Sequence, residues 1–247
     1  MKIGKYLYGI IPRQNKLELA LDSIMPTFGD IHTIDYKELS ALVSNAPIKV
    51  YNPEKELILR HEKVVASVMK ETTIIPARYG IVARKAAEVG ELLEANYDYL
   101  FEKTKELENK VELSLRIFWR KDKLADDIQS EELRKIKMEA DSQQKLDQAT
   151  QIKLGEIAFQ VVEDKREQYI RQIYEPLKQK AISAKLNNIL NVRMVCNCAF
   201  LVSREDEPKF DALVNALYLE HAQVLDFKYS GPWPPYNFVD LVLTFSS

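Results

Sequence analysis

The sequence predicts an α+β protein made of two tandem ferredoxin-like domains in modified form, the second carrying an inserted long helical hairpin. Strand and helix patterns alternate through residues 1–109. The alternation starts again near Val111, and about 70 residues of charged helical sequence then interrupt it. We therefore predict an N-terminal domain at 1–109 and a C-terminal domain at 110–247, with the helical insertion at about 122–190.

The first domain begins with strand patterns. Tyr6–Ile11 is an apolar run of strand length, and Ile31–Tyr36 and Leu39–Ser44 form a predicted hairpin, with a first helix that is weak or missing before it. Asn52 and Pro53 then predict an N-cap and a first-turn proline. The helix that follows has an apolar stripe made of Leu57, His61, Val64 and Val68.

The rest of the first domain contains a strand and a second helix. Thr72–Tyr79 is rich in β-branched residues, and Gly80 is expected to end it. One helix is then predicted, interrupted on its apolar side by Asn96. Its apolar positions are Val89, Leu93, Leu100 and Leu107.

The second domain repeats this logic around the insertion. Apolar residues alternate with polar ones from Val111 to Trp119, so Glu112 is expected on the polar face of a half-buried strand. The hairpin should turn near 141–155, and Pro176 should kink or end its second helix. The remaining predicted elements are a strand at Val192–Ser203, a helix opened by Glu207 and Pro208, and strands at Leu225–Tyr229 and Val239–Phe245.

Composition and charge argue against several classes of function. The chain has seven glycines and none are closely spaced, which does not fit a phosphate-binding loop. The formal net charge of −2 gives no sign of a basic surface for nucleic acid or an anionic membrane. No apolar run approaches the roughly 20 residues needed to cross a bilayer. We therefore expect a cytoplasmic protein with no membrane and no nucleic-acid partner.

Few residues suggest catalysis or metal binding. Cys196 and Cys198 alternate on one strand face among apolar residues, where cysteine usually packs as a small hydrophobe. His61 lies on an apolar helix face without a second histidine at metal-binding spacing, so a buried, hydrogen-bonded histidine is the favoured interpretation. We predict no catalytic, cofactor-binding or metal-binding residues.

Two segments have the character of recognition surfaces. Arg78 and Tyr79 follow a proline in a strand-like run, and both residue types are favoured at interface hot spots; a surface ion pair for Arg78 is an equally good interpretation. The second segment, residues 231–239, holds three prolines and the aromatic residues Trp233, Tyr236 and Phe238. Because proline lacks a backbone donor, this segment must be a rigid piece at a sheet edge or corner. These five side chains are the predicted partner contacts.

Five segments, in order along nearly the whole chain, resemble the gas vesicle protein F/L family. They are Tyr6–Ile10, Leu59–Val65, Ile75–Gly80, Phe200–Arg204 and, most specifically, Gly231–Val239. The resemblance implies a non-enzymatic accessory protein of gas vesicle formation, with two α+β domains and no cofactor. It also implies association with the vesicle and binding to its major hydrophobic shell protein, and to other accessory gas vesicle proteins.

Other functions remain open at this level. Tandem ferredoxin-like domains often bind small effectors, so a small-molecule-binding regulatory module is the main alternative. An enzyme built on His61, Arg78 and a carboxylate is a second, and RNA binding by the sheet is a poorly supported third. For the shell protein, near-neutral charge and clustered aromatic residues favour contact through sheet edges or aromatic side chains rather than through charge.

Overall fold

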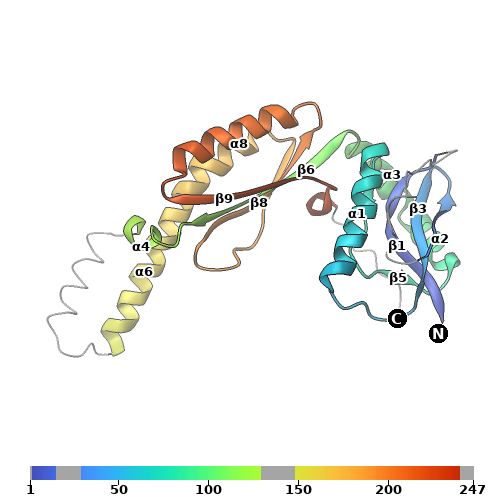
Figure 1. Cartoon of the computed structure of the whole chain (residues 1–247), viewed down its shortest axis with the longest axis horizontal. Helices are drawn as coiled ribbons and strands as arrows, with labels where there is room; N and C mark the ends of the chain where they lie inside the picture. The colour runs from blue at the N-terminus through green and yellow to red at the C-terminus, as the bar shows by residue number, and fades with distance from the viewer. Residues whose placement is uncertain (1, 15–28, 129–147, 240–247) are drawn as a thin grey trace. The chain divides into compact units, whose positions relative to one another are not determined.

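The computed structural model describes residues 2–14, 29–128 and 148–239. It is an α+β structure with two antiparallel sheets, and the chain divides into two compact units (Figure 1). The first unit is Met1–Glu112 together with the segment that begins at Pro232, and the second is Leu113–Gly231. The predicted domain at 110–247 included that last segment, whereas the observed contacts group it with the N-terminal unit.

The first sheet has β1 (Ile3–Pro12) at its centre. β3 (Leu39–Pro47) pairs with it on one side, with β2 (Ile31–Tyr36) beyond, and β4 (Ile75–Pro76) and β5 (Val82–Ala83) pair with it on the other. This gives the order β2-β3-β1-β4, and each of these strand pairs is antiparallel. The strands predicted for this region are confirmed, with the Thr72–Tyr79 run shortened to β4.

Gly9 lies beside a register shift in β1 and faces the neighbouring strand β4. Leu7 is opposite Val43 and Gly9 is opposite Leu42, so Tyr8 is an extra residue in a β-bulge. A Cβ on Gly9 would lie 2.7 Å from the backbone oxygen of Ile75. Glycine is therefore needed here so that β1 and β4 can approach each other closely.

Three α-helices belong to the first unit within the described residues. Helix α1 (Lys55–Glu71) buries His61, Val64, Val65, Val68 and Met69, which confirms the predicted stripe. Its N-cap is Glu54 rather than Asn52, because the backbone N–H of Glu54 already bonds to the Asn52 carbonyl in a turn ahead of the helix. The single helix predicted after Gly80 is two, α2 (Ala86–Ala95) and α3 (Tyr97–Glu106). They break at Asn96, whose side chain donates to the Leu92 carbonyl and so competes with continued helix.

The second sheet has the same order of strands within its unit. It consists of β6 (Lys110–Trp119), β7 (Ser183–Leu186), β8 (Met194–Ser203) and β9 (Leu225–Trp233), in the order β7-β8-β6-β9. Most of the predicted strand Val239–Phe245 lies outside the described residues; within them β9 is an edge strand. It includes Pro232, which lacks a backbone donor and is tolerated at an edge. β7 falls inside the predicted helical insertion, so the prediction of helix up to about residue 190 was wrong.

The helical part of this unit is described from residue 148 onward, after the short α4 (Leu124–Asp127). Residues 129–147, where most of the first arm of the predicted hairpin would lie, are outside the described residues. Helix α6 (Gln148–Tyr169) continues through one π-helical turn (Ile170–Tyr174) into α7 (Glu175–Lys178). In that turn the N–H of Glu175 bonds to the Ile170 carbonyl, which shifts the hydrogen-bond pattern just before Pro176, whose nitrogen cannot donate. The prediction was that Pro176 would kink or end the helix; the structure has the π-helical turn just before the proline, and the helix ends two residues after it, at Lys178.

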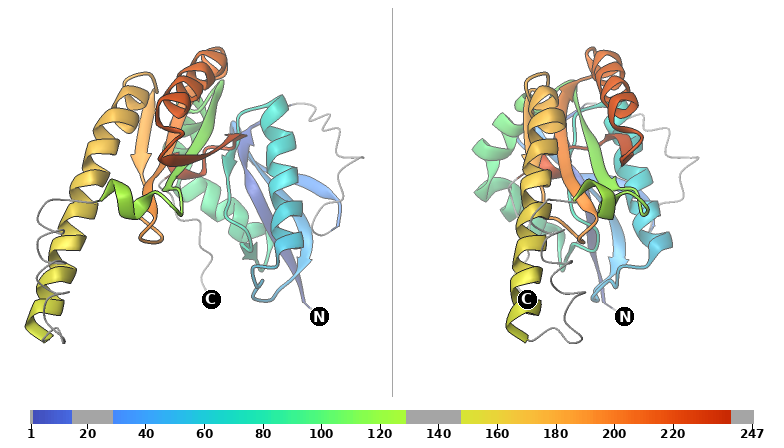
Figure 2. Two further views of the ribbon diagram at one scale, coloured as in Figure 1. Left: turned by 60° about the vertical axis from the view of Figure 1, so that its left-hand side comes forward. Right: turned by 90° about the vertical axis from the view of Figure 1, so that its left-hand side faces the viewer.

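Helix α8 (Glu207–His221) lies on the same face of the sheet as the π-helical turn. Phe200 on β8 contacts both Tyr174 and Phe210, with ring centroids 5.8 Å and 5.1 Å apart. One side chain thus joins two helical segments to the sheet. Figure 2 shows α6 and α8 beside the strands of this unit, and α1 beside those of the first.

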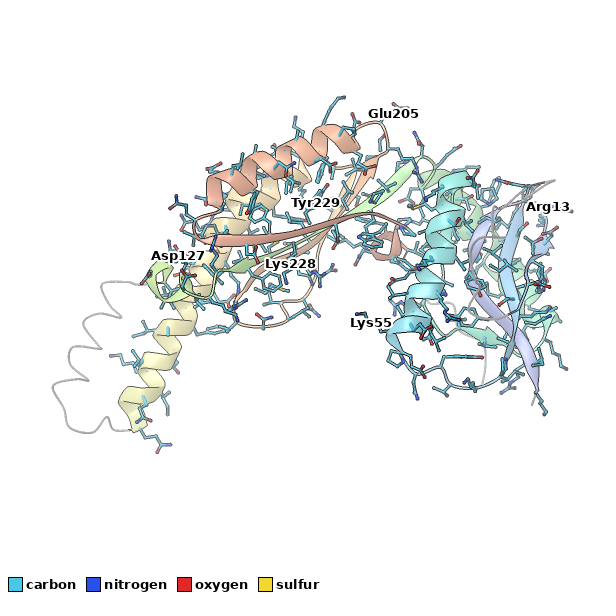
Figure 3. The ribbon with its side chains drawn as sticks, viewed as in Figure 1. Arg13, Lys55, Asp127, Glu205, Lys228 and Tyr229 are labelled. Atoms are coloured by element: carbon cyan, nitrogen blue, oxygen red, sulfur yellow. The ribbon has the colours of Figure 1, made fainter. Side chains whose placement is uncertain are left out.

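Side-chain hydrogen bonds also join the helices of this unit to its strands. The carboxylate of Asp127 accepts hydrogen bonds from Trp119 Nε1 and the Tyr169 hydroxyl, both at 2.8 Å (Figure 3). The Tyr229 hydroxyl on β9 donates to Asp211 on α8 at 2.6 Å (Figure 3). Helices and sheet are therefore joined by hydrogen bonds as well as by the core.

Candidate functional site

A buried histidine and tyrosine network lies beneath the Ile75–Gly80 segment. His61 Nε2 is 3.0 Å from the carbonyl oxygen of Ala77, which can only accept, so this nitrogen carries the proton. His61 Nδ1 then accepts from the Tyr6 hydroxyl at 3.0 Å. The Tyr6 oxygen in turn accepts the backbone N–H of Gly80 at 3.1 Å. The chain of hydrogen bonds joins β1, α1 and the segment after β4.

This network is structural. Burial lowers the pKa of His61 to about 4, with the Ala77 hydrogen bond opposing the shift, so the ring is neutral near pH 7. The ring stacks on Tyr8 at 5.5 Å and meets Tyr79 edge-on at 6.0 Å. Both ring nitrogens are hydrogen-bonded, which confirms the predicted interpretation of His61 and leaves neither nitrogen available to a substrate.

The proline and aromatic segment is attached to the first unit by a buried carboxylate. Glu112, 4% exposed, accepts the backbone N–H of Asn237 at 2.7 Å and its side-chain amide at 2.5 Å. A short 3-10 turn (Tyr236–Phe238) presents both donors to it. The expectation that Glu112 lies on a polar, solvent-facing side of its strand was wrong, because this segment covers it.

Tyr236 is held in the same region. Burial, together with the nearby Glu62 and Glu112, raises its pKa. Its hydroxyl is buried and has no hydrogen-bond partner among the described residues. A buried hydroxyl without a partner costs about 1–3 kcal/mol, so the segment is held in place by other contacts.

The five predicted contact residues divide by exposure. Arg78 is exposed and makes no ion pair with any residue that the structure describes. Tyr79 is half-buried and donates to the Asn52 carbonyl at 3.2 Å, and Trp233 is 38% exposed. Phe238 is only 4% exposed and packs in the core. Tyr236 is half-buried, as Tyr79 is, so Arg78 and Trp233 are the two exposed members of the set.

Tyr6 relates the two segments to each other. The rings of Tyr6 and Tyr79 are 6.3 Å apart. Burial raises the pKa of Tyr6 most, and Tyr79 and Tyr236 both add to the shift through their charge when ionised. Tyr6 therefore bonds to the first segment at Gly80 and lies near Tyr236 of the second. The sequence does not reveal this position, since an apolar strand run gives no sign of which residue its tyrosines will contact.

The two cysteines are buried side by side on β8. Their sulfur atoms are 3.2 Å apart, and Cys198 Sγ donates to the Leu115 carbonyl at the same distance. The contact with Cys196 and burial raise the pKa of the Cys198 thiol. Among the described residues, no group of three or more His, Cys, Asp or Glu side chains is placed to hold a metal ion. Nor does any helix in the described ranges have the length and apolar character to cross a membrane.

The comparisons with known proteins agree along the chain. Residues 4–240 match the family described as gas vesicle synthesis protein GvpL/GvpF. Gas vesicle protein F of Microcystis aeruginosa (strain PCC 7806) is 28% identical over 98% of this chain and 100% of its own length. Gas vesicle protein F1 of Halobacterium salinarum (strain ATCC 700922 / JCM 11081 / NRC-1) is 27% identical over 96% and 92%.

Solved structures show the same fold. The crystal structure of GvpF from Microcystis aeruginosa aligns with a TM-score of 0.79 at 26% identity, covering 96% of this chain and 99% of that one. That of GvpF from Anabaena sp. PCC7120 aligns with the same TM-score at 24% identity, covering 96% and 98%. This is a family of gas vesicle proteins and not a known enzyme family, which agrees with a histidine that is used structurally. The chain belongs to the gas vesicle protein GvpL/GvpF family.

Proposed function

We propose that this chain is a non-enzymatic accessory protein of gas vesicle formation, which binds the major hydrophobic shell protein during assembly or initiation. In this proposal it acts in the cytoplasm, in association with the growing vesicle and with other accessory gas vesicle proteins. The observation that carries the proposal is the family match over residues 4–240. Its physical basis is that a shell protein with apolar surface and open strand edges aggregates unless it is covered before assembly.

The surface proposed for this contact consists of Arg78, Tyr79 and Trp233. Two features support it. The side chains belong to segments held rigidly, by His61 and Tyr6 in one case and by Glu112 in the other. Arg78 also has no ion pair within the described residues, so its guanidinium is available to a partner. Rigid aromatic and arginine side chains lose little conformational freedom on binding and are frequent hot spots.

We also infer that both units are variants of the ferredoxin-like arrangement, with the insertion of the second unit forming a helical hairpin. The support is the shared order of strands, in which the first strand of each unit lies between the third and the fourth.

Capture of the shell protein by the tagged full chain tests the function. Arg78→Ala and Trp233→Ala should each lower the captured amount by about tenfold, as expected for hot-spot residues. Arg84→Ala is the matched control for arginine, since Arg84 is exposed in the same unit. Tyr99→Ala is the control for Trp233, because both are 38% exposed. Capture that falls steeply with salt, while Trp233→Ala has no effect, would contradict the proposal.

A further inference from the structure

The outer strand of the second sheet carries an exposed apolar surface. β7 is an edge strand, paired only with β8 among the described residues (Figure 2). Apolar residues on the strand, just before it and in the loop after it are between 41% and 67% exposed. They are Ile182, Leu186, Ile189, Leu190 and Val192, which we call the β7 edge surface. An exposed apolar strand edge is a feature that proteins normally avoid unless it binds something.

The backbone of β7 is open on its outer side. Ser183 is opposite Leu201 and Lys185 is opposite Ala199, and the N–H of Asn187 bonds to the Asn197 carbonyl at 2.7 Å. In an antiparallel pair the bonded positions alternate, so the N–H and C=O groups of Ala184 and Leu186 point away from β8. These groups are where a further strand would form its hydrogen bonds.

Side chains on this edge continue the core of the unit. Ala184 is opposite Phe200, which contacts Tyr174 and Phe210 under the helices. Because side chains alternate along a strand, Leu186 lies on the same face as Ala184. A strand added beside β7 would therefore extend a sheet face that is already apolar and partly covered by helices.

The segment that forms the edge is basic. Between Glu175 and Glu205 the sequence has no acidic residue and five basic ones, Lys178, Lys180, Lys185, Arg193 and Arg204. Two acidic side chains lie nearby and are paired: Glu175 with Lys178, and Glu163 with Arg166, which also bonds to the Val192 carbonyl. Lys180 is exposed and Arg193 half-exposed, and neither forms an ion pair with a described residue. The charges left available beside the strand, at Lys180 and Arg193, are therefore positive.

We propose that the β7 edge surface binds an extended, apolar segment of a partner protein that carries acidic side chains, by addition of a strand to the second sheet. The open backbone groups favour a peptide over a lipid surface, because hydrocarbon cannot satisfy N–H and C=O groups. The positive charges of Lys180 and Arg193 favour an acidic partner over a second copy of this chain, which would bring like charges together. The surface lies in the second unit, so the proposal does not depend on the contact proposed for Arg78, Tyr79 and Trp233.

A designed peptide tests the proposal directly on the full chain. The probe is a short fluorescein-labelled peptide in which valine alternates with threonine and glutamate, and binding is followed by fluorescence anisotropy at low salt. A matched peptide with lysine in place of glutamate should bind about tenfold more weakly. A third peptide, N-methylated at alternate amides, should lose binding because it cannot form the strand pairing.

Variants of the protein locate the binding surface. Ala184→Pro removes an outward N–H without removing a bond to β8, and should weaken binding about fivefold or more, since edge strands tolerate proline. Leu186→Asn should weaken it similarly, whereas Leu219→Asn, the same change at a 75% exposed leucine on α8, should leave it unchanged. Circular dichroism shows whether each variant folds. The N-methylated peptide tests the strand pairing on the unaltered protein, so that result does not depend on the folding of a variant.

Three results would overturn the proposal. The first is equal affinity for the acidic and basic peptides, or no effect of N-methylation. The second is binding to phosphatidylglycerol vesicles without binding to the peptide, which would make the edge a membrane contact. The third is concentration-dependent self-association that Leu186→Asn abolishes, which would make the edge a contact between copies of this chain.

Discussion

The carboxylate of Glu112 accepts both the backbone N–H and the side-chain amide of Asn237, 125 positions further along the chain. This pair holds the proline and aromatic segment to the N-terminal unit. A carboxylate can accept two donors at once without carrying a donor of its own, which suits a buried site facing two N–H groups. The pair therefore explains why an acidic residue is buried on a strand that otherwise reads as half-exposed.

Replacing the carboxylate should loosen the segment. Glu112→Gln introduces an amide N–H₂ against one of the two Asn237 donors, so at least one hydrogen bond is lost and the free energy of unfolding should fall by about 1–3 kcal/mol. Urea denaturation measures this, and the emission of Trp233 should shift to longer wavelength if the segment detaches. The control is Glu108→Gln, because Glu108 is exposed. Equal effects of the two substitutions would show that the observed pair contributes nothing.

The stability of the first unit should fall in acid through His61. The folded pKa of about 4 is below the ordinary value of 6.5, so the unfolded chain takes up the proton first as the pH falls. The contribution of neutral His61 to the free energy of unfolding is complete above pH 6.5 and is lost progressively as the pH falls toward 4. The total loss is about 3 kcal/mol.

Comparison with a variant isolates this contribution from that of the carboxylates. His61→Gln should be less stable near neutral pH, because the buried hydrogen bonds are disturbed, but its stability should change less between about pH 7 and about pH 4. Denaturation at several pH values measures both. His32→Gln, on strand β2, is the control for removing a histidine elsewhere in the first unit. An unchanged slope in His61→Gln would contradict the assignment.

Two glycines should respond in opposite ways to the same substitution. In Gly9→Ala the new Cβ meets the Ile75 backbone oxygen at 2.7 Å, so the change should destabilise by about 1–3 kcal/mol. In Gly90→Ala, within helix α2, nothing lies within 4 Å of the Cβ, and the change should stabilise by about 0.5–1 kcal/mol. Thermal denaturation under one set of conditions compares them. A neutral Gly9→Ala would mean that β1 and β4 do not approach as closely as described.

The cysteine thiols should be unreactive in the folded protein. Burial and a raised pKa keep Cys198 protonated, and the thiolate is the reactive form. A chromogenic disulfide reagent should react at least about tenfold more slowly with the native chain than with the denatured one. Ser183→Cys, at an exposed position of β7, should add one rapidly reacting thiol. Fast reaction of the parent protein would show that β8 opens readily.

Local sequence patterns located most elements but not their ends. The alternation from Val111 to Trp119 and the stripe of α1 each follow from side-chain periodicity, so both were predictable. β7 was missed because Ser183–Leu186 is a short mixed segment at the end of a helical pattern. Its strand character depends on pairing with β8, and such pairing is not a property of the segment alone. The break at Asn96 was visible as a polar gap, although the sequence did not show that the gap divides two helices.

The candidate site was predicted in its residues but not in its arrangement. The sequence by itself determined the family, the α+β class and the rigid nature of residues 231–239, because proline restricts the backbone wherever it occurs. It also determined that His61 is buried, since its helix face is apolar. Only the tertiary structure decided that Glu112 is buried beneath Asn237, that the Tyr6 hydroxyl bonds to His61 and Gly80, and that Phe238 lies in the core while Trp233 reaches solvent. These depend on which parts of the chain meet in space, and no local pattern encodes a contact between residues more than a hundred positions apart.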